Sequence, residues 1–544
     1  MLRGLSASLL LASFLAAAPF AETRPKLVVV IAVDQFSTEL MQTYGPELTG
    51  GLAQLRREGV FFTEAYHDHA FTETGPGHSV LLSGRFPAST GIVENRWLDR
   101  ASGKFVYCVE DAAAKSLTPP GLAGSSNARF LGEVLGDWLQ AQVPGSRVFA
   151  VSGKDRAAIL MAGRRPTGTF WFTGPAGFTS STAYAPRLPD WLVRYDQGFS
   201  SRLAADSWLW SQDPATPAGR SAQWTLGATT VRNGGLPRLI QGAGMPLDKN
   251  FEARFRKSPF LDAVTLEAAE ALLEGEKLGR GPGTDLLAVS FSATDYIGHN
   301  YGTLGTEMRD QIHRLDQLLG RLLDRLRHQY PGAWVVLSAD HGGLDIPEAL
   351  IDQGFPAHRL LPEPFMAALQ ADLRATFKVD RALLLPTTEP NALYLDELAV
   401  KASGLDRRDV LKRIQTWLRA RPEVAEACTA EELAAVDPAA SGSPRDSSLR
   451  VLLRRSFRRE RSGDILVAVK PLVVIGNPPT GYPATHGTPN AYDRRVPLIF
   501  WGPWRGGERH EPVRIVDLAP TLAKELGLRS GTVDGSALDL GPRK

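Results

Sequence analysis

The amino-acid sequence predicts an α/β protein with a doubly wound, mostly parallel central sheet flanked by helices and a small inserted α+β subdomain. Continuous apolar runs rich in β-branched residues are typical of strands that are buried on both faces of a sheet. Helical periods separate these runs, and strands that alternate with helices indicate a parallel sheet covered by helices. Three of the runs end in or near an aspartate. Ligands bind at the carboxyl ends of strands in such sheets, so this edge is the expected functional site.

The strands and helices of the main domain follow from these patterns. The predicted buried strands are residues 27–33, 285–291, 333–339 and 496–501. Two long helices are expected over residues 261–278 and 307–326, where apolar side chains recur at helical spacing. Asp34, Asp295 and Asp340 follow the first three strands and should therefore meet at one edge of the sheet.

Residues 375–470 differ in pattern from the rest of the chain and predict the inserted subdomain. Its expected elements are short strands over 391–396, 424–428 and 464–470 and an amphipathic helix over 408–419. The main domain is then divided into residues 22–374 and 471–544. Within the insertion, residues 450–461 contain six arginines. A solvated helix face is the expected role of such a run, and a contact with an anion or a surface is the alternative.

The first 21 residues have the layout of a secretory signal peptide. Arg3 precedes an apolar stretch over residues 5–18, and small residues follow. The stretch is shorter than the ~20 residues needed to span a bilayer, although an uncleaved membrane anchor is the alternative. We therefore expect a periplasmic or secreted protein with no membrane span after removal of the signal.

Composition restricts the kind of site that the protein can have. The 544 residues are 43% hydrophobic and 22% charged, which is ordinary for a soluble globular protein. The net charge of +2 provides no general attraction to nucleic acid, so a bound anion must be held by local charge. Cys108 and Cys428 are the only cysteines; they form either a disulfide or two buried free thiols. Neither has partners at zinc-finger spacing, so any metal must be held by histidines and carboxylates.

A set of histidines and aspartates has the composition of a two-metal site. It includes a D-x-x-x-H pair, an Asp-His pair at a strand end, the aspartate after the first strand, and a histidine in a Pro/Gly-rich loop that begins at Asn477. Two zinc ions with three protein ligands each would retain an open position for water, nucleophile or substrate, although these ligands also suit other divalent ions. The candidate ligands are Asp34, Asp295, His299, Asp340, His341 and His486.

Thr74 is the candidate nucleophile. It precedes Gly75, Pro76 and Gly77 and then an apolar stretch, which predicts a helix that starts at or near Thr74. A hydroxyl at a helix start lies beside free backbone N–H groups, where phosphate binds readily. A plain capping threonine is the alternative, but two nearby zinc ions would favour its alkoxide.

These residues resemble the alkaline phosphatase superfamily and, within it, the PafA-type phosphatases with a threonine nucleophile. The resemblance extends over nearly the whole mature chain and includes the stretches 91–95, 152–156 and 517–521. It implies that Thr74 takes the phosphoryl group and also contacts one zinc ion. It implies one zinc ion on Asp295, His299 and His486, and the other on Asp34, Asp340 and His341.

The same resemblance implies the substrate class. Asn95 would donate to a phosphate oxygen, Gly75 would contact substrate, and Lys154 and Arg156 would form a cationic pair at the phosphate. A phosphate monoester is a dianion and needs more positive charge than a diester. Lys154 and Arg156 would reach the same point only if the segment is extended.

The sequence thus predicts a two-zinc hydrolase of small phosphate monoesters that acts as a monomer, through a phospho-threonine intermediate. The related nucleotide pyrophosphatases/phosphodiesterases share the zinc ligands, the threonine and the asparagine but lack the cationic pair. A diesterase of that type is the first alternative. A catalytically silent zinc- or phosphate-binding protein is the second.

Overall fold

The computed structural model describes residues 24–214, 216–217, 221–226, 229–387, 390–439, 442–477 and 481–544. The predicted signal peptide, residues 1–21, lies outside these ranges, as do residues 478–480 of the Pro/Gly-rich loop. Within the described ranges, every helix is either too short or too polar to cross a bilayer.

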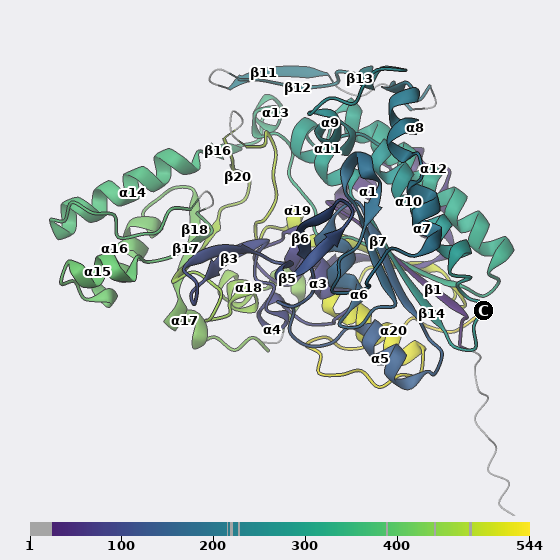
Figure 1. The fold of residues 1–544 in the computed structure, drawn as a ribbon. Coiled ribbons are helices and arrows are strands. Elements are labelled where there is room, and N and C mark those ends of the chain that lie inside the picture. The colour runs from purple at the N-terminus through teal and green to yellow at the C-terminus, as the bar shows by residue number, and fades with distance from the viewer. Residues whose placement is uncertain are drawn as a thin grey trace, which may run out of the picture.

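A ten-stranded sheet forms the centre of the molecule, and helices cover both of its faces (Figure 1). This arrangement confirms the predicted α/β class. The strands lie in the order β22 (Gly507–Arg509), β2 (Val60–Tyr66), β21 (Arg495–Trp501), β15 (Trp334–Ser338), β1 (Leu27–Val33), β14 (Asp285–Phe291), β7 (Val148–Ser152), β8 (Gly168–Phe172) and β9 (Phe178–Thr179), and β23 (Val513–Arg514) pairs with β2.

The middle of the sheet is parallel, as the sequence predicts. In the register of β1, Ala32 lies opposite Ser290 of β14 on one side and Ser338 of β15 on the other. The residues that follow these three strands therefore leave the sheet at the same edge. The strand predicted over 496–501 is β21, but it runs antiparallel to both of its neighbours. A continuous apolar run reports burial on both faces and contains no information on strand direction.

Helices on the two faces of the sheet position the loops at this edge. On one face α3 packs against α6, and on the other α10 packs against β14 while α12 packs against α2 and α11. The two long predicted helices are α10 and α12, which begin and end within a few residues of the expected limits. The bounds are α2 (Gly51–Glu58), α3 (Thr74–Leu81), α6 (Asp155–Ala162), α10 (Phe260–Gly275), α11 (Ala293–Tyr301) and α12 (Thr306–Gln329).

A second hydrophobic cluster contains residues from Leu360 to Ile475. It packs around a small antiparallel sheet, and it lies apart from the main sheet in Figure 1. The strand predicted over 391–396 pairs with β19 at Ala392 and Leu393 and forms an isolated bridge to Leu384 at Leu395, before Asp396 caps the next helix. The elements are β16 (His358–Leu360), α14 (Pro362–Phe377), β17 (Ala392–Leu393), α15 (Glu397–Ala402), α16 (Arg407–Arg419), β18 (Val424–Thr429), α18 (Leu449–Ser456), β19 (Ile465–Val469) and β20 (Val473–Ile475).

The arginine-rich segment 450–461 is not simply a solvated helix face. Arg455 on α18 is buried and forms an ion pair with Asp68 in the loop after β2. The same carboxylate also pairs with Arg494 and Arg514. The Arg455 ion pair joins α18 to the loop after β2, so part of the arginine run has a structural role.

The two cysteines are both free thiols and both buried. Cys108 belongs to the core of the main domain, whereas Cys428 belongs to a cluster around α18 and β19. Of the two alternatives that the sequence leaves open, the structure therefore has the free thiols.

Candidate active site

The predicted ligands converge at the carboxyl ends of the parallel strands. Asp34 directly follows β1, and its N–H donates to the carbonyl of Phe291 at the end of β14. Asp340 lies two residues beyond β15 and Asp295 lies in the first turn of α11. Asp34, Asp295 and Asp340 are almost completely buried.

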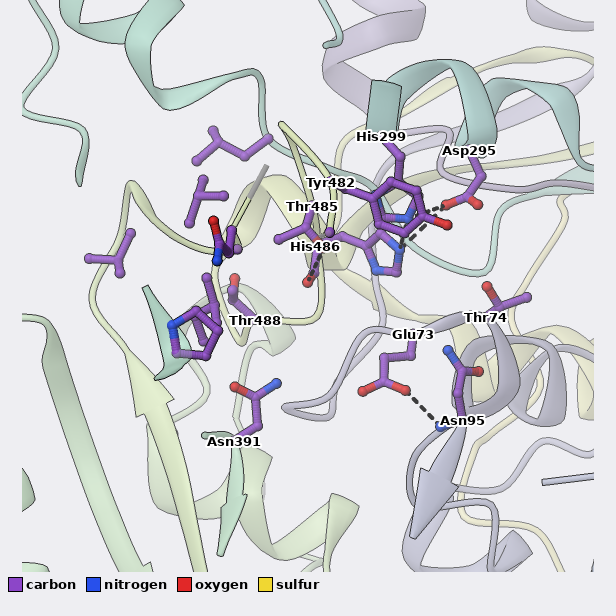
Figure 2. Close-up of a pocket in the computed structure, with 18 of the residues that line it drawn as sticks. Glu73, Thr74, Asn95, Asp295, His299, Asn391, Tyr482, Thr485, His486 and Thr488 are labelled. Atoms are coloured by element: carbon purple, nitrogen blue, oxygen red, sulfur yellow. Dashed lines mark hydrogen bonds and ion pairs between the residues drawn. The ribbon is translucent and has the colours of Figure 1, made fainter. Parts of the chain in front are cut away.

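The first group of ligand atoms comes from α11 and the loop that contains His486. Asp295 and His299 are four residues apart on α11, so their side chains leave the same face of the helix. Asp295 Oδ1 lies 3.3 Å from His299 Nε2 and 3.4 Å from His486 Nε2, and the two imidazole nitrogens are 3.2 Å apart (Figure 2). Ligand atoms around a tetrahedral zinc ion are about 3.3 Å apart. The three atoms therefore have the spacing that zinc requires.

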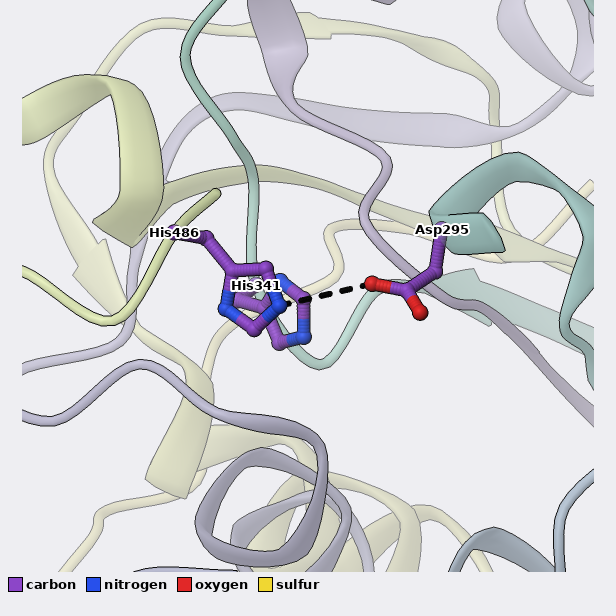
Figure 3. A group of neighbouring side chains, drawn as sticks. All are labelled: Asp295, His341 and His486. Atoms are coloured by element: carbon purple, nitrogen blue, oxygen red, sulfur yellow. Dashed lines mark ion pairs between the residues drawn. The ribbon is translucent and has the colours of Figure 1, made fainter. Parts of the chain in front are cut away.

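The second group lies between β1 and β15. Its ligand atoms, from Asp34, Asp340 and His341, are all within 4.8 Å of one another. His341 Nε2 is 3.6 Å from Asp34 Oδ1 and 3.3 Å from Asp340 Oδ2. His341 also adjoins the first group, because its ring stacks on that of His486 with centroids 3.6 Å apart (Figure 3).

Backbone carbonyls orient all three histidines. The Nδ1 atoms of His299, His341 and His486 lie 2.7–2.8 Å from the carbonyl oxygens of Ala484, Gly342 and Thr72, respectively. A proton on each Nδ1 leaves the Nε2 lone pair free for a metal, which is the usual outer-shell arrangement at a histidine ligand. Burial lowers the pKa of both His341 and His486, which favours the neutral, metal-binding form.

Among the described residues, four buried ligand atoms at this edge form no hydrogen bond and make only ion-pair contacts within the site. They are Asp34 Oδ1, Asp295 Oδ1, Asp340 Oδ2 and His341 Nε2. Unpaired buried polar atoms are destabilising, and buried charges are normally paired or coordinated to a metal. The donor set and its open atoms therefore fit two divalent cations, with zinc favoured by the nitrogen and oxygen ligands.

Lys154 joins the two ligand groups. Its Nζ lies 2.6 Å from Asp34 Oδ2 and 2.6 Å from Asp295 Oδ2. The ammonium thus contacts the carboxylate oxygen that faces away from each group of ligand atoms and leaves Oδ1 open. Burial alone would lower the pKa of Lys154, but the carboxylates of Asp295 and Asp34 raise it above its ordinary value.

Lys154 and Arg156 reach Thr74 in a way that the sequence does not predict. The segment is not extended throughout: Lys154 is the extended residue before α6, and Arg156 lies in its first turn. Lys154 Nζ is 3.5 Å from Thr74 Oγ1, and Arg156 Nη2 is 3.1 Å from the same oxygen. The turn at the helix start brings the two cations together at one hydroxyl.

Thr74 is the first residue of α3, one position inside the helix, and Glu73 is its cap residue. The helix lies very close to the strand end that contributes Asp340. A Cβ atom at Gly77 would collide with the backbone carbonyl of Asp340, so only glycine permits this approach. The helix that carries Thr74 and the second ligand group are therefore packed as one unit.

Asn95 lies beside the start of α3 (Figure 2). Its Oδ1 accepts a 2.7 Å hydrogen bond from the Gly75 N–H, and its own N–H donates to Glu73 Oε2 at 2.6 Å. The Gly75 N–H, which the sequence suggests as a substrate contact, is thus already paired with Asn95. Because Oδ1 accepts this bond, the amide nitrogen of Asn95 is left to donate elsewhere.

These residues line one end of a cavity of about 580 Å³. Thr74, Asn95 and Arg156 form that end together with Asp295 and the two histidines of the first group. The opposite wall comes from Leu344, the start of α14, Asn391, the strand β20 and the loop near Tyr482. The volume lies within the range of about 300–1,000 Å³ that is typical of small-ligand pockets.

Three further residues at the site are not predicted from the sequence. His78 Nδ1 lies 3.1 Å from Asp340 Oδ2; its position four residues after Thr74 on one helix is a signal that could have identified it. Tyr107 accepts from Arg156 Nη1 at 3.2 Å and donates to Asp155 at 2.6 Å. Tyr482 stacks on the ring of His299 at 4.3 Å. Tyr107 and Tyr482 lie in a hairpin and a loop, where no periodic pattern marks them.

The chain is similar in sequence to one protein family and to several known phosphatases. Residues 28–490 match the family described as type I phosphodiesterase / nucleotide pyrophosphatase. The chain is 37% identical to the alkaline phosphatase PhoK of Sphingomonas sp, over 96% of this chain and 92% of that protein. It is 30% identical to the alkaline phosphatase PafA of Elizabethkingia meningoseptica, over 94% and 93% of the two chains.

Solved structures agree with these relationships. The crystal structure of wild-type PafA matches with a TM-score of 0.82 at 27% identity, covering 95% of this chain and 99% of that one. A PafA variant altered at a threonine, an asparagine, a lysine and an arginine matches equally well. Residues of the same four types, in the same order, surround the start of α3 here. Murine ectonucleotide pyrophosphatase / phosphodiesterase 5 shares only the fold, with a TM-score of 0.51 at 14% identity.

Proposed function

The chain belongs to the type I phosphodiesterase / nucleotide pyrophosphatase family and is a phosphomonoester hydrolase of the PafA type, and we propose that it works with two zinc ions and a phospho-threonine intermediate. Its substrates are small phosphate monoesters, and its products are an alcohol and inorganic phosphate. The alternative of a catalytically silent binding protein is set aside by the relationship to named alkaline phosphatases.

One observation carries the proposed mechanism: Thr74 Oγ1 lies within 3.5 Å of Lys154 Nζ and 3.1 Å of Arg156 Nη2, beside both ligand groups. A monoester dianion has three non-bridging oxygens, and its transfer requires concentrated positive charge. Lys154 and Arg156 supply that charge at the hydroxyl that would attack phosphorus.

The protein groups then have distinct roles in two displacement steps. Thr74 Oγ1 forms a bond to phosphorus in line with the ester oxygen; the ester P–O bond breaks, and the alcohol leaves with the electron pair and takes up a proton. Arg156 and the amide nitrogen of Asn95 hold the non-bridging oxygens during transfer. Water then attacks the phospho-threonine from the opposite side, which releases phosphate and restores Thr74.

The ligand groups have the donors that two zinc ions need. Asp295, His299 and His486 would hold one ion and Asp34, Asp340 and His341 the other, with Thr74 adjoining the second. When bound, the two ions supply positive charge that favours the Thr74 alkoxide and stabilises the departing alcohol oxygen. Lys154 orients one carboxylate of each group.

A phosphodiesterase is the second candidate, because the matching family includes phosphodiesterases in its description. A diester places a substituent on one of the oxygens that Lys154 and Arg156 would hold, and it has one negative charge fewer. The cationic pair at Thr74 therefore supports the monoesterase. We further propose that the signal peptide directs the protein to the periplasm or the exterior, where it acts as a monomer.

The test compares hydrolysis of a phosphate monoester and its matching diester by the wild type and by Lys154→Ala, Arg156→Ala and Thr74→Ala, with zinc content measured in each preparation. We expect about two zinc ions per chain, a monoester preference that is lost in the lysine and arginine variants, and no acid-stable phosphoprotein in Thr74→Ala. A diester preference that persists in Lys154→Ala would exclude the proposed substrate class.

A further inference from the structure

The cavity extends well beyond the residues that would hold the phosphoryl group. Thr74, Asn95 and Arg156 are at one end, whereas Asn391 and Thr488 lie across the open space in Figure 2. A phosphoryl group fills only a small part of about 580 Å³. The remaining volume adjoins His299 and His486, on the side where the alcohol of the ester would depart.

The far wall of this space has an apolar part beside the polar side chains of Asn391 and Thr488. The apolar part consists of Leu344, Pro362 and the strand β20, which contributes Val473, Val474 and Ile475. Tyr482 adds an aromatic ring, 42% exposed, whose position is set by stacking on His299. A wall of this kind binds the apolar body of a ligand by removing it from water.

The charges on the wall have one sign. Among the described residues that line the cavity, Arg156 is the single lysine or arginine, and it lies at the phosphoryl end. Glu363 is exposed in the first turn of α14, and Glu73 lies between the phosphoryl end and the wall. The Oε2 of Glu363 accepts a hydrogen bond from the Asn477 amide at 3.4 Å, and among the described residues Glu363 forms no ion pair with a cation.

A neighbouring cavity has the same character. It is about 410 Å³ in volume and shares Glu73 and Asn95 with the first. Its lining adds the partly exposed ring of Phe105 together with Tyr394, Glu94 and Arg96. The cations Lys154 and Arg156 therefore lie where phosphate would bind, and the surrounding walls are neutral to acidic.

We propose that this wall is a subsite for the alcohol part of the ester, and that it selects alcohols with an uncharged or cationic apolar body against alcohols that have a second anionic group. The inference rests on the proposed function and assigns a substrate class to the same site. Glu363 repels a second anion on the alcohol, while β20 and Tyr482 bind the apolar body.

The test uses three esters with the same reacting end: phenethyl phosphate and its para-carboxy and para-aminomethyl derivatives. The ethyl linker insulates the ester oxygen from the para group, so differences in rate report the subsite. We expect kcat/KM for the para-carboxy ester to be about fivefold below that for phenethyl phosphate, and the para-aminomethyl ester to react at least as well as the parent.

Glu363→Gln removes the charge with little change in shape. It should reduce the ratio of kcat/KM between phenethyl phosphate and the para-carboxy ester to about twofold, and Glu363→Lys should reverse the preference. The matched control is Glu511→Gln, which makes the same change in net charge at an exposed position outside the cavity lining and should leave the ratio unchanged.

The outcomes separate this inference from the proposed function. Equal kcat/KM for the three esters, or a ratio that does not respond to Glu363→Gln, would overturn the subsite while leaving the monoesterase intact. Failure of the wild type to hydrolyse any of the three, with diesters cleaved instead, would overturn the proposed function itself.

Discussion

At the scale of single residues, the site depends on side chains that act through others. Tyr107 is the clearest example, because its hydroxyl accepts from Arg156 Nη1 at 3.2 Å and donates to Asp155 Oδ1 at 2.6 Å. It thereby directs the other guanidinium nitrogen toward Thr74. A hydrogen bond to a charged group contributes about 1.5–3 kcal/mol, which corresponds to roughly tenfold or more in rate.

We therefore expect Tyr107→Phe to lower kcat/KM for a phosphate monoester about tenfold and to change diester hydrolysis much less. Steady-state rates on a matched monoester and diester measure this difference. Tyr195→Phe is the control, because it removes another phenol hydroxyl that bonds a backbone carbonyl in the helical region around α10. Equal losses on both substrates would show that Tyr107 has only a structural role.

Asp493 gives a pH-dependent prediction. It is fully buried, and its Oδ2 accepts from the Thr488 N–H at 2.8 Å and the Thr488 hydroxyl at 2.6 Å. Burial raises the pKa of Asp493 from its ordinary value of 3.8 to about 7. Asp493 therefore binds a proton more tightly in the folded protein than in the unfolded chain. The free energy that this proton adds to stability is complete below the pKa of Asp493 in the unfolded chain and is lost as pH rises through about 7.

Asp493→Asn cannot ionise, and its amide oxygen can still accept from Thr488. The melting temperature of the variant relative to the wild type should therefore rise between about pH 4 and about pH 8. Calorimetry of both proteins across this range measures the difference. Parallel curves would mean that Asp493 does not titrate in this window.

At the scale of elements, the helix α11 carries two candidate ligands, and a carboxylate from another helix fixes its first residues. The carboxylate of Asp262 on α10 accepts from the N–H groups of Ser292 and Ala293 at 2.8 and 2.9 Å, which fixes the start of α11. Asp316 fixes the start of α2 in the same way, because its carboxylate accepts from Leu52 N at 2.7 Å, and α2 carries none of the candidate ligands. The two aspartates allow a matched comparison.

We expect Asp262→Ala and Asp316→Ala each to reduce the free energy of unfolding by about 1–3 kcal/mol, because each leaves buried N–H groups unpaired. Only Asp262→Ala should also weaken zinc binding, by roughly tenfold or more, since α11 carries Asp295 and His299. Competition with a chromophoric chelator measures zinc affinity independently of activity. Equal zinc affinity in the two variants would separate α11 from the metal site.

The elements also show what the sequence could and could not predict. The buried strands before Asp34, Asp295 and Asp340 are predicted nearly to the residue, because a continuous apolar run of that length has one structural solution in an α/β protein. The hairpin of β3 (Arg96–Asp99) and β4 (Lys104–Tyr107) is not predicted, because charged residues interrupt its apolar pattern. The sequence could predict that Lys154 and Arg156 act together. It could not predict how their side chains meet at Thr74, because that depends on the residue at which α6 begins.

At the scale of the whole molecule, the ligands come from positions as distant as Asp34 and His486 and are held together by one sheet edge. Without bound cations, the buried carboxylates of Asp34 and Asp340 repel each other; burial and the neighbouring Asp340 raise the pKa of Asp34 well above its ordinary value. Any ion that binds the folded state alone stabilises it, by an amount that grows with the logarithm of the free ion concentration relative to Kd.

Removal of metal by a chelator should therefore lower the melting temperature, and added zinc should restore it. At a free zinc concentration of about 100 times Kd, the stabilisation is about 2.7 kcal/mol per site. Calorimetry with parallel metal analysis measures the effect. A melting temperature that is unchanged after complete removal of zinc would contradict the predicted link between the site and the stability of the fold.

The position of Lys154 has a consequence for the order in which the enzyme is assembled. Its ammonium lies 2.6 Å from a carboxylate of each ligand group, so the chain provides its own cation at the centre of a buried cluster of negative charge. We therefore expect folding to proceed without an ion and metal to bind afterwards to carboxylates that are already in place. The scarcity of zinc would limit how many molecules are active rather than how many are folded. Protein made in metal-poor surroundings would constitute a reserve that begins to work when metal arrives.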